Sequence, residues 1–156
     1  MRTILRSVAL LSLALLPLSL SATAQESSPT EAVRFFYDPP SYEPDPAVRD
    51  HFTDPAKSKF DQNDKVSTDG ETCFDWVLGL DAQDYDEAVL AKTLKLEEDE
   101  TGDTATVTAT FSLFDGQPDS DREIVWSLKN VGGAWKISDI WSKTNDWKVS
   151  TLECQG

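Results

Sequence analysis

The 156-residue chain carries 28 acidic and 14 basic residues, so its formal net charge at pH 7 is −14. A surface this acidic repels phosphate backbones and anionic lipid headgroups, which argues against a nucleic-acid-binding or membrane-surface protein. It favours a cationic partner, although acidity can also serve only to keep an exported protein soluble.

The first 24 residues have the organisation of a secretory signal peptide. Two arginines precede an apolar stretch over residues 8–20, and residues 22–24 offer small side chains for signal peptidase. The apolar stretch is shorter than the roughly 20 residues that span a bilayer. We therefore expect cleavage after Ala24, a single domain over residues 25–156, and a periplasmic or secreted location. Without its leader the chain has 12 basic and 28 acidic residues, a net charge of −16.

Cys73 and Cys154 are the only two cysteines of the chain. An even pair in an oxidising compartment predicts one structural disulfide, and the absence of a CxxC motif argues against a redox-active pair. The closed loop of about 80 residues would stabilise the fold by up to about 4.5 kcal/mol in the chain-entropy description.

Proline-marked helix starts occupy the N-terminal half. Ser28, Pro29 and Glu31 form a capping box with proline in the first turn, and they predict a helix that ends before residues 38–40. An aspartate followed by proline at residues 45–46 and again at 54–55 predicts two short helices. The polar residues 61–71 are expected to form a loop.

The C-terminal half has the period of two that is typical of strands. Apolar and polar residues alternate over residues 104–113, which predicts a half-buried strand. Residues 94–96 are expected to belong to its partner, with the acidic residues 97–103 as the hairpin loop. Further strands are predicted at 124–128, from 135, and from 147 to 152 with Cys154 at the end. Helices followed by a four- to five-stranded antiparallel meander indicate an α+β fold.

Three segments together resemble an uncharacterised bacterial exported family, domain of unknown function 3828. They are residues 33–37 (VRFFY), residues 74–75 with 82–85 (FD and AQDY), and residues 133–140 (GAWKISDI). The family is similar in layout to cystatin-like folds of the nuclear-transport-factor-2 superfamily, in which helices pack into the concave side of a curved sheet and form a cone. The resemblance implies this fold and an exported location. It implies no activity, because members of the superfamily range from isomerases and dehydratases to binding modules.

Candidate catalytic residues are weakly indicated. Asp75 and Asp84 lie in a crowded acidic segment beside Trp76 and Tyr85, where burial in a pocket would raise the pKa of one carboxyl group. His51 is the only histidine and the best single candidate for a general base. The alternative is that both aspartates are solvated and that His51 lies on a helix surface.

No cofactor or metal is expected, because the chain lacks a glycine-rich phosphate loop, a complete EF-hand order and a multi-histidine cluster. Aromatic side chains are the candidates for binding a ligand or partner, with core packing as the alternative: Trp76, Tyr85, Trp141 and Trp147.

The first functional hypothesis is therefore an exported acidic binding or accessory protein, such as an inhibitor or immunity-type partner of a cationic protein. The alternative is a small pocket enzyme of isomerase, dehydratase or hydrolase type that uses a buried aspartate or His51 as the base.

Overall fold

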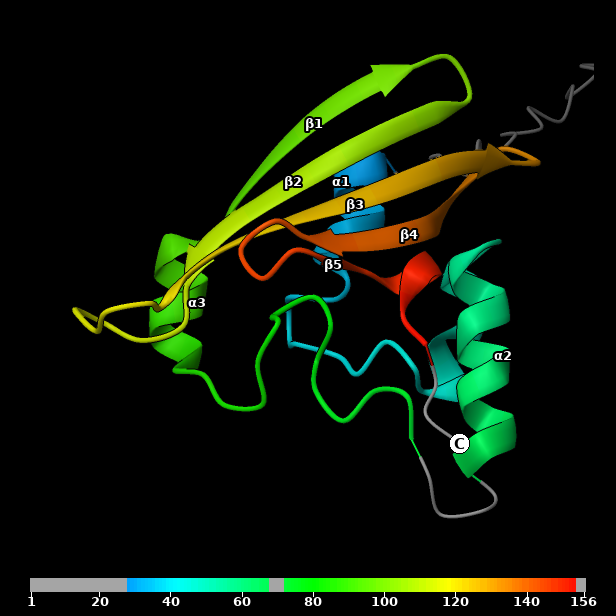
Figure 1. The fold of residues 1–156 in the computed structure, drawn as a ribbon. Helices are drawn as coiled ribbons and strands as arrows, with labels where there is room; N and C mark the ends of the chain where they lie inside the picture. Colours follow the sequence, from blue (N-terminus) through cyan, green and yellow to red (C-terminus); the bar gives the residue numbers. More distant parts are fainter. Residues whose placement is uncertain (1–27, 68–71, 154–156) are drawn as a thin grey trace, which may run out of the picture.

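The computed structural model describes residues 28–67 and 72–153, which form the predicted α+β fold (Figure 1). Helices come first along the chain and an antiparallel sheet follows. In this part of the chain the elements are α1 (Pro29–Arg34), the 3-10 helix η1 (Pro46–His51), α2 (Ala56–Ser67), α3 (Glu87–Thr93), β1 (Lys95–Thr101), β2 (Thr104–Ser112), β3 (Asp121–Val131), β4 (Ala134–Ser142), β5 (Trp147–Lys148) and the 3-10 helix η2 (Val149–Thr151).

The predicted helix starts are confirmed by their caps. At α1 the Ser28 hydroxyl accepts from the Glu31 backbone N–H at 3.1 Å, and the Glu31 carboxylate accepts from the Ser28 N–H at 2.9 Å, which completes the capping box. At η1 the Asp45 carboxylate accepts from the Ala47 N–H at 2.8 Å. These caps satisfy backbone donors that have no partner within the helix.

The expected loop over residues 61–71 is wrong for its first part, because α2 continues to Ser67. Tertiary contacts stabilise this extension. Asn63 is buried, and its amide oxygen accepts from the Cys73 N–H at 2.9 Å. Arg49 bridges to Asp61 at 3.1 Å and to Asp64 at 3.0 Å, so polar residues that suggested a loop hold the helix against η1.

The five strands pair in chain order, β1-β2-β3-β4-β5, and every pair is antiparallel. The predicted hairpin is present, but the expected loop over residues 97–103 is wrong for residues 97–101. Strand β1 pairs with β2 without interruption from Lys95 opposite Thr110 to Thr101 opposite Thr104. Only Gly102 and Asp103 turn the chain, and Gly102 has the positive φ of 61° that favours glycine.

Two further elements of the structure, β5 and α3, differ from the predictions. The last predicted strand is reduced to the two residues of β5, because the chain then turns into η2 and buries Val149. Helix α3 was not predicted. Asp86 caps it by accepting from the N–H groups of Ala88 and Val89, and Leu90 anchors it in the core.

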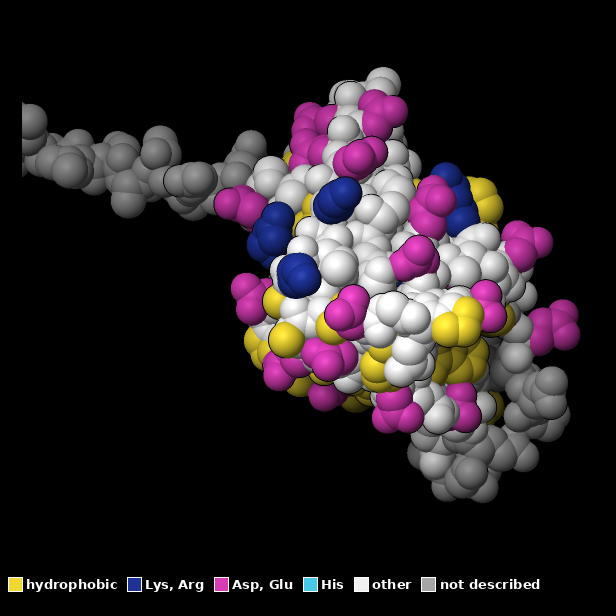
Figure 2. Space-filling model, turned by 90° about the vertical axis from the view of Figure 1, so that its left-hand side faces the viewer, with side chains coloured by type: hydrophobic (Ala, Val, Ile, Leu, Met, Phe, Trp, Pro, Cys, Tyr) yellow, Lys and Arg dark blue, Asp and Glu magenta, His cyan; other side chains and the backbone are white. Residues whose placement is uncertain are grey.

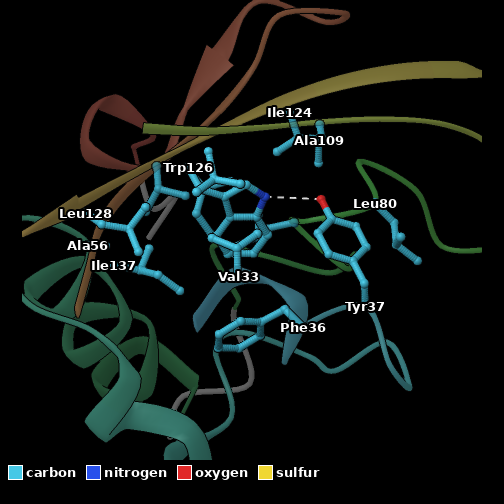
Figure 3. Close-up of a cluster of buried hydrophobic side chains, with 14 of the residues drawn as sticks. Val33, Phe36, Tyr37, Ala56, Leu80, Ala109, Ile124, Trp126, Leu128 and Ile137 are labelled. Carbon is cyan, nitrogen blue, oxygen red and sulfur yellow. Dashed lines mark hydrogen bonds between the residues drawn. The ribbon is translucent and has the colours of Figure 1, made fainter. Parts of the chain in front are cut away.

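The core lies on the side of the sheet that carries Trp126, which is fully buried (Figure 3). The ring of Phe36 stacks on Trp126 with centroids 5.4 Å apart, and Phe52 packs against Phe36 at 5.3 Å. The Trp126 indole N–H donates to the Tyr37 hydroxyl at 3.1 Å. Side chains therefore occupy the space beside Trp126 that an open cone would leave for a ligand.

Within residues 28–67 and 72–153, no helix is long and apolar enough to cross a membrane.

Candidate functional site

A strap, here defined as residues 72–86, connects the end of α2 to α3 and is largely irregular. Its apolar side chains Phe74, Leu78 and Leu80 are at most 1% exposed, so the strap is part of the core. The Tyr37 hydroxyl donates to the Gly79 carbonyl at 2.8 Å. The strap is thus held by both apolar and polar contacts.

Glu43 is the most deeply buried acid of the described residues, with an exposed fraction of 0%. Its carboxylate accepts from the backbone N–H groups of Leu78 at 2.9 Å and Gly79 at 2.8 Å. Burial raises the pKa of Glu43 to about 7, although the donated hydrogen bonds oppose this rise. Sequence reasoning missed Glu43, because an isolated glutamate between Tyr42 and Pro44 has no motif around it.

The candidate catalytic residues are not brought together. Asp75 and Asp84 are exposed. His51 is half-buried and stacks on the Phe35 ring at a centroid distance of 4.1 Å. Burial and the nearby Lys136 lower the pKa of His51. In the described part of the chain no hydrogen bond or ion pair joins any two of the three candidates.

Three surface depressions, of about 650, 360 and 570 Å³, lie on the described part of the molecule. The first lies beside α3 and the ends of β2 and β3, and the second crosses β2 and β3. The third borders the turn between β2 and β3. Glu43, His51, Asp75 and Asp84 line none of them. The buried carboxylate of Glu43 therefore holds the strap, and none of these three depressions reaches it.

Two of the candidate binding tryptophans meet. Trp76 and Trp147 form an edge-to-face pair with centroids 5.8 Å apart. The Trp147 indole N–H donates to Asp81 at 2.7 Å, and Asp81 also accepts from the Ser142 hydroxyl at 2.6 Å. Asp81 adopts a positive φ of 51°. This cluster joins the strap to the β4–β5 turn, and Trp76 and Trp147 pack within it.

The other two aromatic candidates lie elsewhere. Tyr85 is partly buried against the core. Trp141 is half-buried on β4, and the ammonium groups of Lys143 and Lys148 lie 5.6 and 5.2 Å from its ring centroid. Cation–π contacts thus occupy the Trp141 ring, and the four aromatic candidates form no common site.

The strongest concentration of negative charge without ion pairs lies on strand β1 and the turn that follows it. We call the residues that carry it the acidic edge: Glu97, Glu98, Asp99, Glu100 and Asp103. All five are exposed, and none takes part in the four ion pairs of the described residues. Figure 2 shows Asp and Glu side chains gathered on the topmost part of the molecule, which Figure 1 identifies as the β1–β2 hairpin. Sequence reasoning noted these acids and placed them in a loop.

In the described ranges no three His, Cys, Asp or Glu residues are grouped so as to hold a metal ion. Cys73 is half-buried against the core, and Cys154 lies outside the described residues. The Cys73–Cys154 disulfide therefore stays a prediction.

Neither a protein-family model nor a curated protein sequence matches this chain. Its fold is similar to that of a chain in the type VI native effector-immunity complex Tae3-Tai3 from Ralstonia pickettii. The TM-score is 0.52 at 20% sequence identity, over 76% of this chain and 97% of that chain. The selenomethionine form of that complex matches with a TM-score of 0.46 at 19% identity, over 72% and 92% of the two chains. At a sequence identity this low, the similarity is evidence for the fold alone.

Proposed function

We propose that this chain is an exported immunity-type protein that binds a cationic effector and blocks its action. The acidic edge carries this proposal. Five carboxylates lie within seven residues, all exposed and all outside the ion pairs of the described residues. Such a concentration of charge accelerates association with a positively charged surface and selects against acidic partners.

The fold supports the same proposal, because it is shared with a chain of a structure that contains an effector and its immunity protein. The leader-like residues 1–24 would place the protein in the periplasm, where the proposed complex with the effector would form. We also retain the resemblance to domain of unknown function 3828 as a proposal of family membership.

The enzyme alternative has less support. A pocket enzyme needs its acid or base beside a cavity that admits a substrate. Asp75 and Asp84 are exposed, and His51 packs on Phe35. The buried acid, Glu43, accepts two backbone hydrogen bonds and lines none of the three depressions.

The test begins with the full chain, tagged at its C-terminus and isolated at low salt from an envelope extract of its own bacterium. We expect a stoichiometric basic partner that elutes as the salt concentration rises. That partner, expressed alone in the periplasm of a test host, should stop growth, and co-expression of this chain should restore it. A captured partner that is harmless, or that remains toxic beside this chain, would overturn the proposal.

A matched pair of triple variants tests the role of the acidic edge. In the first, Glu97, Asp99 and Glu100 are each replaced by Lys. In the control, Asp75, Asp84 and Asp115, which are also exposed, are each replaced by Lys. The change in net charge is identical, so a contribution of overall acidity would weaken both variants equally. We expect the edge variant to bind the captured partner at least about 100-fold more weakly than the control variant.

A further inference from the structure

The two edges of the sheet are protected very differently. Beyond β4, the edge is covered by β5 and by the segment before α2, where the Thr53 N–H donates to the Ile137 carbonyl at 2.8 Å and Phe52 forms a parallel bridge with Ile137. Lys136 adds a hydrogen bond to the Asp50 carbonyl. This edge has few backbone groups left to pair with another chain.

The β1 edge is left open within the described residues. Strand β1 is seven residues long and pairs with β2 on one side, and no strand or isolated bridge of residues 28–67 or 72–153 pairs with its other side. Its register has no bulge and its sequence has no proline or glycine. Short length, bulges, proline and charged side chains are the usual means of blocking an edge strand. Of these four, β1 has only the charged side chains.

Carboxylates line this edge of the described sheet, and their charge makes pairing selective. Successive side chains of a strand point to opposite faces, so Glu97 and Asp99 lie on one face and Glu98 and Glu100 on the other. A second copy of β1 laid against this edge would bring like charges together on both faces. A strand with alternating lysine or arginine would instead place its cations on one face, opposite either Glu97 and Asp99 or Glu98 and Glu100.

We infer that β1 accepts an extended basic segment of the partner protein as a sixth strand of the sheet. The inference rests on the proposed function and specifies its binding mode. Main-chain hydrogen bonds to the open edge would supply affinity, and the carboxylates of the acidic edge would select the basic sequence. The Glu98 carboxylate also accepts from the Thr30 N–H at 2.9 Å, so a segment docked here would lie close to the start of α1.

Model peptides separate strand addition from attraction by charge alone. The probe is a nine-residue peptide in which Lys alternates with Val and Thr. The first control has Lys at the same positions with Gly and Ser between them, and the second is the probe with alternate backbone nitrogens methylated. Both controls keep the charge, and each weakens strand pairing. We expect the probe to bind at least about tenfold more tightly than either control. Equal binding of all three would overturn strand addition.

Amide hydrogen exchange locates the contact. Alternate N–H groups of an antiparallel edge strand point away from its neighbour, so only every second amide of residues 95–101 should exchange more slowly when the probe binds. The same pattern is expected with the captured partner. If the partner binds and the edge variant loses it while the β1 amides stay unprotected, strand addition is wrong and the proposed function stands. If the probe gives alternating protection and no toxic partner exists, the edge site stands and the proposed function fails.

Discussion

Glu43 and Gly79 fit together so closely that a methyl group on Gly79 would lie 2.7 Å from the Glu43 carboxylate oxygen and 2.6 Å from the ring of Trp126. Both distances are shorter than van der Waals contact. Position 79 therefore requires the absence of a side chain, and the Glu43 carboxylate can reach the two backbone N–H groups of the strap only because of it.

The substitution Gly79→Ala tests this fit. Because the core around Trp126 is filled, we expect a loss of about 2–3 kcal/mol in the free energy of unfolding, measured by urea denaturation. Gly116→Ala is the control. A methyl group there would meet nothing within 4 Å, although φ is +63°, so the expected cost is about 1 kcal/mol. Equal losses in the two variants would show that position 79 has room.

Glu43 should make stability depend on pH. Its pKa rises from 4.5 to about 7 on folding, so the folded state binds this proton more tightly than the unfolded state. Stability from this group is therefore present below about pH 4.5 and is lost as the pH rises to 7, by about 3 kcal/mol at most. The neutral Glu43→Gln variant should lack this decline. Parallel pH profiles of unfolding for the two proteins would rule out a titrating Glu43.

Asp81 should stabilise the contact between the strap and the β4–β5 turn. Asp81→Ala removes the acceptor for Trp147, Ser142 and Asn145, and we expect it to cost about 2–3 kcal/mol. Asp81→Asn is the matched variant, because asparagine tolerates the positive φ and retains one acceptor oxygen. Asp81→Asn should therefore lose less stability than Asp81→Ala. A red shift of tryptophan emission in Asp81→Ala would report exposure of Trp147, and an unchanged spectrum would argue against the contact.

The predicted disulfide can be measured directly. Protein isolated from the periplasm, denatured without reductant, should contain no free thiol, and reduction should release two thiols per chain. Reduction should also lower the free energy of unfolding, by up to about 4.5 kcal/mol. One or two free thiols before reduction would contradict the pairing of Cys73 with Cys154.

Local signals predicted the elements whose sequence pattern is local. The capping box of Ser28 and Glu31 and the alternation over residues 104–113 can both be recognised from neighbours along the chain, and both appear in the structure. The acidic segment was misjudged for a related reason. Charge and poor strand propensity at residues 97–101 favour a loop, and pairing with β2 overrides that preference.

The sequence by itself determined the α+β class, the placement of helices before an antiparallel meander, the strong negative charge and the leader-like N-terminus, because these follow from composition and short-range periodicity. Only the tertiary structure decided that Glu43 accepts a hydrogen bond from Gly79, 36 residues further along the chain. It also decided that Asp81 accepts hydrogen bonds from the β4–β5 region, and that the acids of β1 lie on an open sheet edge. Such contacts join residues distant in the chain. They are set by how buried side chains fill space together, which no local pattern encodes.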